Sequence, residues 1–171
     1  IGLSEDYSNS LYYRTAGGGY WVTFLNAEFD CVSVSNKHTV IRDDIVAKAL
    51  SAALNSNLFW WYYSINFDLF NFKDYMIFGF QFTYTDKTTL SNIIKLSDQM
   101  EISLRENAVY YSINSATNGL NETVTYQKFK SKDIMDTIDK ELKKIYNFTD
   151  EELDFIINYD IKYRMGDELN E

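Results

Sequence analysis

The sequence predicts an α+β domain from three observations: strand-like alternation in its first part, helix-like spacing of apolar residues further on, and an abundance of aromatic residues. Strands followed by runs of helices are typical of such domains. The chain has 171 residues, 46% hydrophobic and 17% aromatic, so it can bury a core and is not expected to be disordered. We expect a mixed or antiparallel sheet in the N-terminal half, packed with helices, and a C-terminal helical extension. The predicted division is 1–132 for the α+β domain and 133–171 for the extension.

Three consecutive glycines, Gly17, Gly18 and Gly19, separate two aromatic stretches. Residues 11–15 and 20–26 each alternate with the period of two that strands show, which predicts a β-hairpin with the glycines in its turn. The alternative is a phosphate-binding loop. No Lys-Ser/Thr pair follows the glycines, however, and the next segment has a strand pattern rather than the start of a helix.

The remaining elements follow from turn signals and from apolar residues spaced by three and four. Asp43 and Asp44 precede one such run, where their charge favours the positive end of the helix dipole. The segment from Thr149 to Glu152 has the form of a capping box, which marks a helix start. In chain order we expect a strand at 31–34, a polar loop at 35–39, a helix from Asp43 to about Tyr63, strand and connection over 68–84 with a bulge or close approach at Gly79, a helix over 87–112, a loop or loose hairpin over 114–124, a helix at about 133–146, and a short helix from 149.

The net charge of −9 argues against a polyanionic partner until its distribution is considered. Residues 1–90 carry six Lys/Arg and nine Asp/Glu, residues 91–132 carry five and four, and residues 133–171 carry five and twelve. Most of the excess acid therefore belongs to the C-terminal extension. The first 132 residues are nearly balanced and can present a local basic face.

The residue types needed for catalysis are not combined in a recognisable pattern. His38 is the single histidine and Cys31 the single cysteine, expected to be a buried and inert thiol, which excludes His-pair zinc sites and an internal disulfide. Asp139, Glu141 and Lys143 imitate the metal-binding set of a nuclease. Positions two apart on a helix diverge, so we interpret them as a solvated helix face. We expect no catalytic residue and no metal site, and hence no enzyme activity from this part of the protein.

The chain also contains no strong targeting signal. No apolar run approaches the roughly 20 residues of a spanning helix, and no leader pattern is present, so we expect a cytoplasmic protein without a membrane partner. The sequence opens on Ile1 in a polar stretch, which we interpret as the inside of a longer protein.

Three stretches together resemble the C-terminal target-recognition region of large single-chain restriction-modification adenine methyltransferases, the type IIG and phage-exclusion group. They are SLYYRTAGGGYWVTF, ALSAALNSNLFWWYYSINFDLFNFKDY and FKSKDIMDTIDKELKKIYNFTDEELDFIINYDIKYRMG, of which the third is the most specific and the second the least. The resemblance spans nearly the whole chain. It also implies kinship with the recognition domains of type I specificity subunits.

The resemblance implies that the parent protein binds S-adenosylmethionine and methylates an adenine in duplex DNA, in some members with an attached endonuclease. This part would read the DNA sequence and hold no cofactor of its own. Amino-methyltransferases place a pair of prolines beside the reacting amine, and this sequence contains no proline. The catalytic loop of the parent protein would therefore belong to a preceding domain. The expected partners are duplex DNA and the methyltransferase domain of the same chain, with the acidic extension facing away from the phosphates and packed on that domain or on its own sheet.

Reading a base sequence requires side chains that reach base edges, and positioning requires contacts to phosphates. The expected DNA-binding residues are Arg14, the turn Gly17, Gly18 and Gly19, the polar group Asn36, Lys37, His38 and Arg42, and further Lys73, Gln81 and Lys87.

Competing interpretations stay open for several residues. Arg14 has the alternative of a salt bridge inside the sheet, to Asp30, and His38 that of plain surface. Asn55 and Ser56 are expected to serve helix packing, and residues 59–63 the core. For the whole chain, the alternative is a protein-protein interaction module whose aromatic surface docks a partner without contacting DNA.

Overall fold

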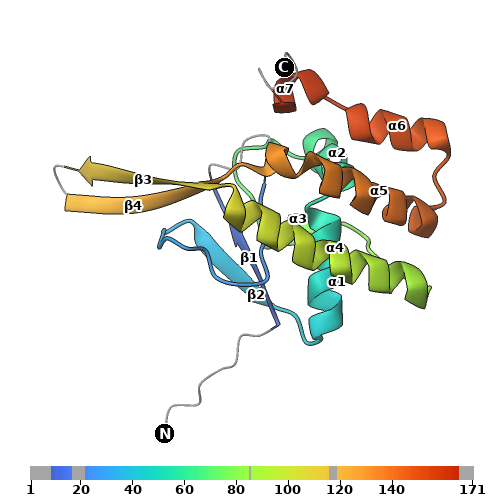
Figure 1. Cartoon of the computed structure of the whole chain (residues 1–171), viewed down its shortest axis with the longest axis horizontal. Helices are drawn as coiled ribbons and strands as arrows, with labels where there is room; N and C mark the ends of the chain where they lie inside the picture. Colours follow the sequence, from blue (N-terminus) through green and yellow to red (C-terminus); the bar gives the residue numbers. More distant parts are fainter. Residues whose placement is uncertain (1–8, 17–21, 85, 116–118, 166–171) are drawn as a thin grey trace, which may run out of the picture.

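Figure 1 shows the computed structural model, which describes residues 9–16, 22–84, 86–115 and 119–165. The α+β prediction is confirmed. Two separate two-stranded antiparallel sheets accompany the helices. In chain order the elements are β1 (Ser10–Arg14), β2 (Asn36–Val40), α1 (Asp44–Leu54), α2 (Asn57–Asn66), α3 (Asp74–Phe78), α4 (Lys87–Glu106), β3 (Ala108–Ser115), β4 (Gly119–Tyr126), the 3-10 turn η1 (Lys128–Ser131), α5 (Lys132–Tyr146), α6 (Asp150–Asn158) and α7 (Ile161–Met165).

The first sheet pairs β1 with β2, in a register that places Arg14 opposite Asn36. The predicted hairpin is therefore wrong, because β1 pairs with β2 and not with the second aromatic stretch. Within the described residues, that stretch forms a single bridge to β1, in which the backbones of Tyr12 and Leu25 exchange hydrogen bonds of 2.8 and 3.0 Å. The predicted strand at 31–34 and loop at 35–39 are also wrong, since the strand is β2. An edge strand with one solvated side needs no apolar alternation, so its polar sequence resembled a loop. The three glycines lie outside the described residues.

The second sheet is the β3–β4 hairpin, in which Ala108 pairs with Tyr126 and Ser115 with Gly119. The hairpin expected over 114–124 is confirmed and is longer than predicted. The expected helix over 87–112 is too long, because α4 ends at Glu106 and the aromatic and β-branched residues that follow form β3.

The predicted helix from Asp43 is two helices, α1 and α2, separated at Asn55 and Ser56. The Ser56 hydroxyl accepts from the backbone N–H of Phe59 at 3.0 Å and so caps α2. The Asn55 amide accepts from Phe24 N at 3.2 Å and donates to Phe24 O at 2.8 Å. Both residues serve packing, as expected.

The segment 68–84 contains no strand in its described part; it holds the short helix α3. Gly79 is a close approach rather than a bulge: a Cβ there would lie 2.8 Å from the Tyr62 hydroxyl and 2.9 Å from the Tyr75 carbonyl oxygen. Larger residues at this position would displace α2 from α3.

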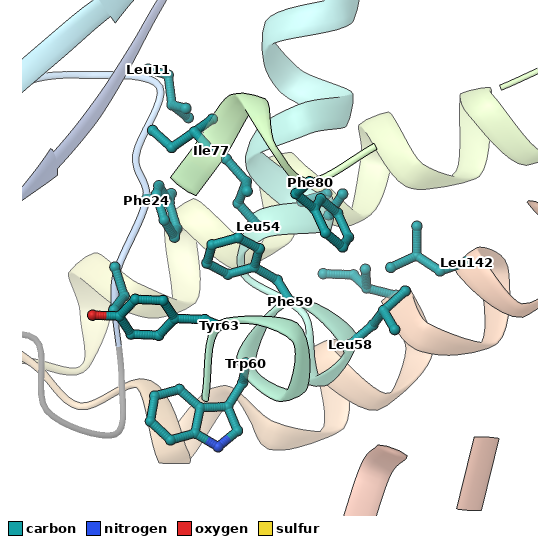
Figure 2. Close-up of a cluster of buried hydrophobic side chains, with 14 of the residues drawn as sticks. Leu11, Phe24, Leu54, Leu58, Phe59, Trp60, Tyr63, Ile77, Phe80 and Leu142 are labelled. Carbon is teal, nitrogen blue, oxygen red and sulfur yellow. The ribbon is translucent and has the colours of Figure 1, made fainter. Parts of the chain in front are cut away.

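Aromatic rings from several segments meet in the main core, together with aliphatic side chains such as Leu54 and Ile77 (Figure 2). Phe59 lies edge-to-face against Phe24 and Phe80, with ring centroids 5.5 and 5.3 Å apart, an arrangement that the ring quadrupole favours. Phe59, Trp60 and Tyr63 are buried as expected, whereas Trp61 and Tyr62 are half-buried.

The C-terminal helices pack mainly on the helices of the body, and Met135 of α5 also joins the core cluster that contains Val124 and Tyr126 of β4. Ile138 and Leu142 of α5 are fully buried in the main core, and α5 contacts α1, α2 and α4. The capping box is confirmed, since Thr149 Oγ1 accepts from Glu152 N and Glu152 Oε2 accepts from Thr149 N. One core thus extends on both sides of residue 132.

Candidate nucleic-acid interface

Arg14 is turned inward, where it joins three strands. Its Nε donates to Asn36 Oδ1 at 3.0 Å, one terminal nitrogen donates to the Val124 carbonyl at 2.9 Å, and the guanidinium lies over the Phe29 ring at 4.8 Å. The alternative partner, Asp30, is paired with an arginine of α4 instead. Arg14 therefore ties the β1–β2 ladder to β4 and is not directed at solvent.

The polar group on and after β2 divides into an internal and an external part. Asn36 accepts from Arg14 and donates to the Cys31 carbonyl at 2.8 Å, so its amide is occupied. Lys37 and His38 are exposed and, as neighbours on a strand, point to opposite faces. The His38 ring contacts Tyr12 at 5.4 Å between centroids.

Arg42, two residues beyond β2, is also exposed. Within the described ranges, neither Lys37 nor Arg42 has a carboxylate partner. We call Lys37, His38 and Arg42 the β2 basic residues.

A hollow of about 180 Å³ opens beside β2. Its lining includes Lys37, His38, Glu28 and the buried Cys31. Burial and then the charge of Glu28 raise the pKa of the Tyr12 hydroxyl, which stays protonated. Because cation and carboxylate line the same hollow, it offers hydrogen bonds to a polar group more than a net positive charge.

The other sequence candidates are dispersed. An isolated bridge between Ala16 and Asn71 brings Lys73 near the end of β1. Gln81 accepts from the Tyr146 hydroxyl through its carbonyl at 2.5 Å, which places it beside α5. Lys87 begins the 20-residue α4, about 30 Å from the end that leads into β3. The structure thus gathers Arg14, Asn36, Lys37 and His38 and leaves Gln81 and Lys87 apart; Gly17, Gly18 and Gly19 lie outside its described part.

Sequence reasoning missed a buried polar cluster, here called the Asp139 cluster and defined as Asn57, Lys128, Asp139 and Arg164. Asp139 is 1% exposed, so its interpretation as part of a solvated helix face is wrong. Its carboxylate accepts from the backbone N–H groups of Asn57 and Leu58, both at 3.0 Å, and from the Asn57 amide at 2.7 Å. A helix of the C-terminal extension thereby caps α2.

Arg164 of α7 and Lys128 complete the Asp139 cluster. Arg164 donates to Asn57 Oδ1 at 2.8 Å and lies over the Trp60 ring at 5.6 Å, while Lys128 Nζ donates to the Val22 carbonyl at 2.6 Å. Burial raises the pKa of Asp139 to about 6 and lowers that of Lys128 well below its usual value. The adjoining cavity measures about 10 Å³, room for one water, so the cluster admits no substrate. Arg164 stands in the Tyr-Arg-Met-Gly stretch quoted in the sequence analysis, but nothing in its spacing indicated a buried arginine.

Two apolar grooves of about 350 and 320 Å³ lie over α2 and the C-terminal helices. They share Trp61 and Phe148, and the larger one is flanked by Glu151 and Glu152. Phe155, 54% exposed, meets Trp61 edge-to-face at 6.4 Å. This surface can receive an apolar partner segment.

Within the described ranges, no group of three or more His, Cys, Asp or Glu is placed to hold a metal ion, and none of the helices there is long and apolar enough to cross a membrane. Comparisons with known protein families, curated proteins and solved structures found no match.

Proposed function

We propose that this chain recognises duplex DNA in a sequence-specific manner and serves an adenine methyltransferase whose catalytic domain lies outside it. The observation that carries the proposal is the position of Lys37 and Arg42, exposed cations without a carboxylate partner among the described residues. Such side chains are available to displace the counterions of DNA, which is the main source of affinity for a duplex.

Glu28 and Asp43 lie beside the β2 basic residues, whereas the acidic turn of the C-terminal helices lies on another part of the molecule. The acidic first turn of α6 holds Asp150, Glu151 and Glu152. In Figure 1, α6 and α7 lie along the upper side of the molecule and the β1–β2 ladder at its lower left. Repulsion between exposed charges weakens with distance and is screened by salt, so acids on α6 oppose DNA at β2 less than acids beside it.

The proposal leaves the chemistry to the parent. S-adenosylmethionine and the reacting adenine would be held by the methyltransferase domain, and the present chain would set which adenine is presented. Cytoplasmic localisation is part of the same proposal, because the substrate DNA of such an enzyme is in that compartment.

Salt-dependent binding tests the proposal. Fluorescence anisotropy of a labelled random-sequence duplex should show affinity falling with salt, and the logarithmic slope should decrease by about 0.9 for each phosphate that Lys37→Ala or Arg42→Ala leaves unneutralised. Lys95→Ala and Lys140→Ala, at exposed lysines on α4 and α5, are matched controls that should leave the slope unchanged. No binding at low salt, or equal effects of all four variants, would refute it.

A second candidate is a protein-protein interaction module, favoured by the two grooves that share Trp61 and Phe148. In this reading the partner is the methyltransferase domain or another protein with apolar and basic side chains. Phe155→Ser should then weaken association with the separately supplied methyltransferase domain and leave duplex affinity unchanged. Loss of duplex affinity in this variant would argue against a separate docking role.

A further inference from the structure

The β3–β4 hairpin, here called the ribbon, is fixed to the body at its base. At its base, Val124 and Tyr126 are 0% and 7% exposed, and the hydroxyls of Tyr110 and Tyr126 donate to Asp30 at 3.1 and 3.0 Å. Asp30 in turn accepts from Arg105 at 2.7 Å. Beyond the base the strands extend past the helices, to the left in Figure 1. The body therefore holds the ribbon in a set direction.

One face of the ribbon is uncharged and exposed or half-exposed along its described length. Side chains alternate between faces, so one face presents Tyr111, Ile113, Asn121, Thr123 and Thr125, here called the outer face. Tyr111 and Ile113 are 49% and 55% exposed, and Ile113 lies directly opposite Asn121. The Asn121 amide is not hydrogen-bonded to any other described residue.

These residue types correspond to the groups displayed in the major groove. An Asn amide pairs with adenine through two hydrogen bonds, Thr hydroxyls pair with several bases, and an apolar side chain contacts the thymine methyl. A two-stranded ribbon fits the groove, which is about 12 Å wide. The two strands carry one charged side chain, Glu122, which lies on the opposite face. The ribbon thus has little affinity for phosphate and is suited to reading bases.

Lys37, one of the two cations argued above for phosphate contact, lies near the base of this element, whereas Arg42 follows the opposite end of β2. Arg14 bonds both to Val124 of β4 and to Asn36, which directly precedes Lys37 and His38 on β2. Positioning and reading can therefore be divided between neighbouring elements, as in other DNA-binding proteins.

We propose that the ribbon enters the major groove of duplex DNA with its outer face toward the base edges, and that Asn121 reads an adenine there. This inference rests on the proposed function and assigns the reading of bases to residues that the sequence analysis did not select. Ile113 contacts a neighbouring thymine methyl, and the Thr123 hydroxyl a base edge.

Selection from a library of duplexes with a randomised central segment tests this inference on the 171-residue chain. The unaltered chain should enrich a motif; Asn121→Ala and the nearly isosteric Asn121→Asp should each flatten the preference at one adenine position, by roughly 5- to 150-fold. For Asn121→Ala, affinity for random duplex and its salt slope should change little, whereas the added carboxylate of Asn121→Asp also lowers affinity for random duplex. Asn66→Ala, at an exposed asparagine at the end of α2, is the matched control and should keep the motif.

The failure of this inference differs from the failure of the proposed function. If Asn121→Asp, Ile113→Ala and Thr123→Val all retain the motif while Lys37→Ala weakens binding, DNA recognition stands and the ribbon is not the reader. If the unaltered chain binds no duplex, both proposals fall. If the ribbon variants instead abolish association with the methyltransferase domain, the outer face is a protein interface and the inference is overturned.

Discussion

The Asp139 cluster and the β2 basic residues show two different fates for charged side chains in one domain. The cluster is buried, and each of its charged members donates to or accepts from a named backbone or side-chain group. The β2 basic residues are exposed, and Lys37 and Arg42 have no carboxylate partner in the described part of the chain. Charge in the first region is used to hold the fold, and charge in the second is available to the DNA of the proposed function. Residue type alone does not distinguish the two regions; burial does.

The largest effect expected from this difference is loss of stability at the Asp139 cluster. Asp139→Ala removes the acceptor of the backbone N–H groups of Asn57 and Leu58, one acceptor of the Asn57 side-chain amide, and a carboxylate that stabilises the charge of Arg164. The free energy of unfolding should therefore fall by about 3–5 kcal/mol. Urea unfolding followed by circular dichroism measures it. Asp133→Ala, at an exposed acid of the same helix, should stay within about 0.5 kcal/mol. Equal effects of the two substitutions would mean that the cluster is not a stabilising unit.

The next largest effect is a pH dependence of the free energy of unfolding, which we expect from the Asp139 cluster. Because the pKa of Asp139 is about 6 in the folded state against 3.8 in the ordinary state, the folded protein binds this proton more tightly than the unfolded chain. The contribution of Asp139 to stability is therefore full below pH 3.8 and is lost as pH rises to about 6, by on the order of 3 kcal/mol.

The measurement is the unfolding free energy of the unaltered chain minus that of Asp139→Asn, followed over the acidic pH range. The difference isolates Asp139 from Lys128, whose lowered pKa makes stability rise with pH instead. A difference that is flat between about pH 4 and 6 would mean that Asp139 titrates as an ordinary acid.

Arg14 combines features of the two regions: we expected it to contact DNA, but its side chain forms hydrogen bonds inside the domain. Arg14→Ala removes two hydrogen bonds and the contact with the Phe29 ring, so we expect a loss of about 1–3 kcal/mol in unfolding free energy. Thermal unfolding measures it, and Arg42→Ala is the matched control. If Arg14→Ala is as stable as the unaltered chain but binds duplex weakly, Arg14 acts at the DNA surface after all.

The parts of the fold that follow from local chemistry could be predicted from the sequence. The capping box at Thr149 and the apolar stripe of α5 depend on neighbouring residues, and both are confirmed. The pairing of β1 with β2 depends on contacts between distant segments, and the polar sequence of β2 gave no sign of it. Asn55 and Ser56 interrupt a helix pattern that would otherwise continue, because their side chains satisfy backbone groups elsewhere.

The candidate site follows the same rule: features set by neighbouring residues could be predicted, and those set by distant segments could not. Exposure of Lys37 and Arg42 followed from their polar surroundings, whereas the inward direction of Arg14 depends on the Val124 carbonyl, 110 residues away in the sequence. The ribbon was mistaken in part for a helix, because Leu104, Ala108 and Tyr111 continue a spacing of three and four beyond the true end of α4.

The smallest expected effect concerns stability at the β2 basic residues themselves. Lys37→Ala and Arg42→Ala, separately and together, should change the free energy of unfolding by less than about 0.5 kcal/mol, because neither side chain is buried or ion-paired within the described residues. Urea unfolding on the samples used for the duplex titrations measures this directly. A double variant that is stable but no longer binds duplex would show that Lys37 and Arg42 act in DNA binding and are not needed for folding. A double variant destabilised as much as Asp139→Ala would instead place them in the same structural role as the Asp139 cluster, and the distinction between the two regions would disappear.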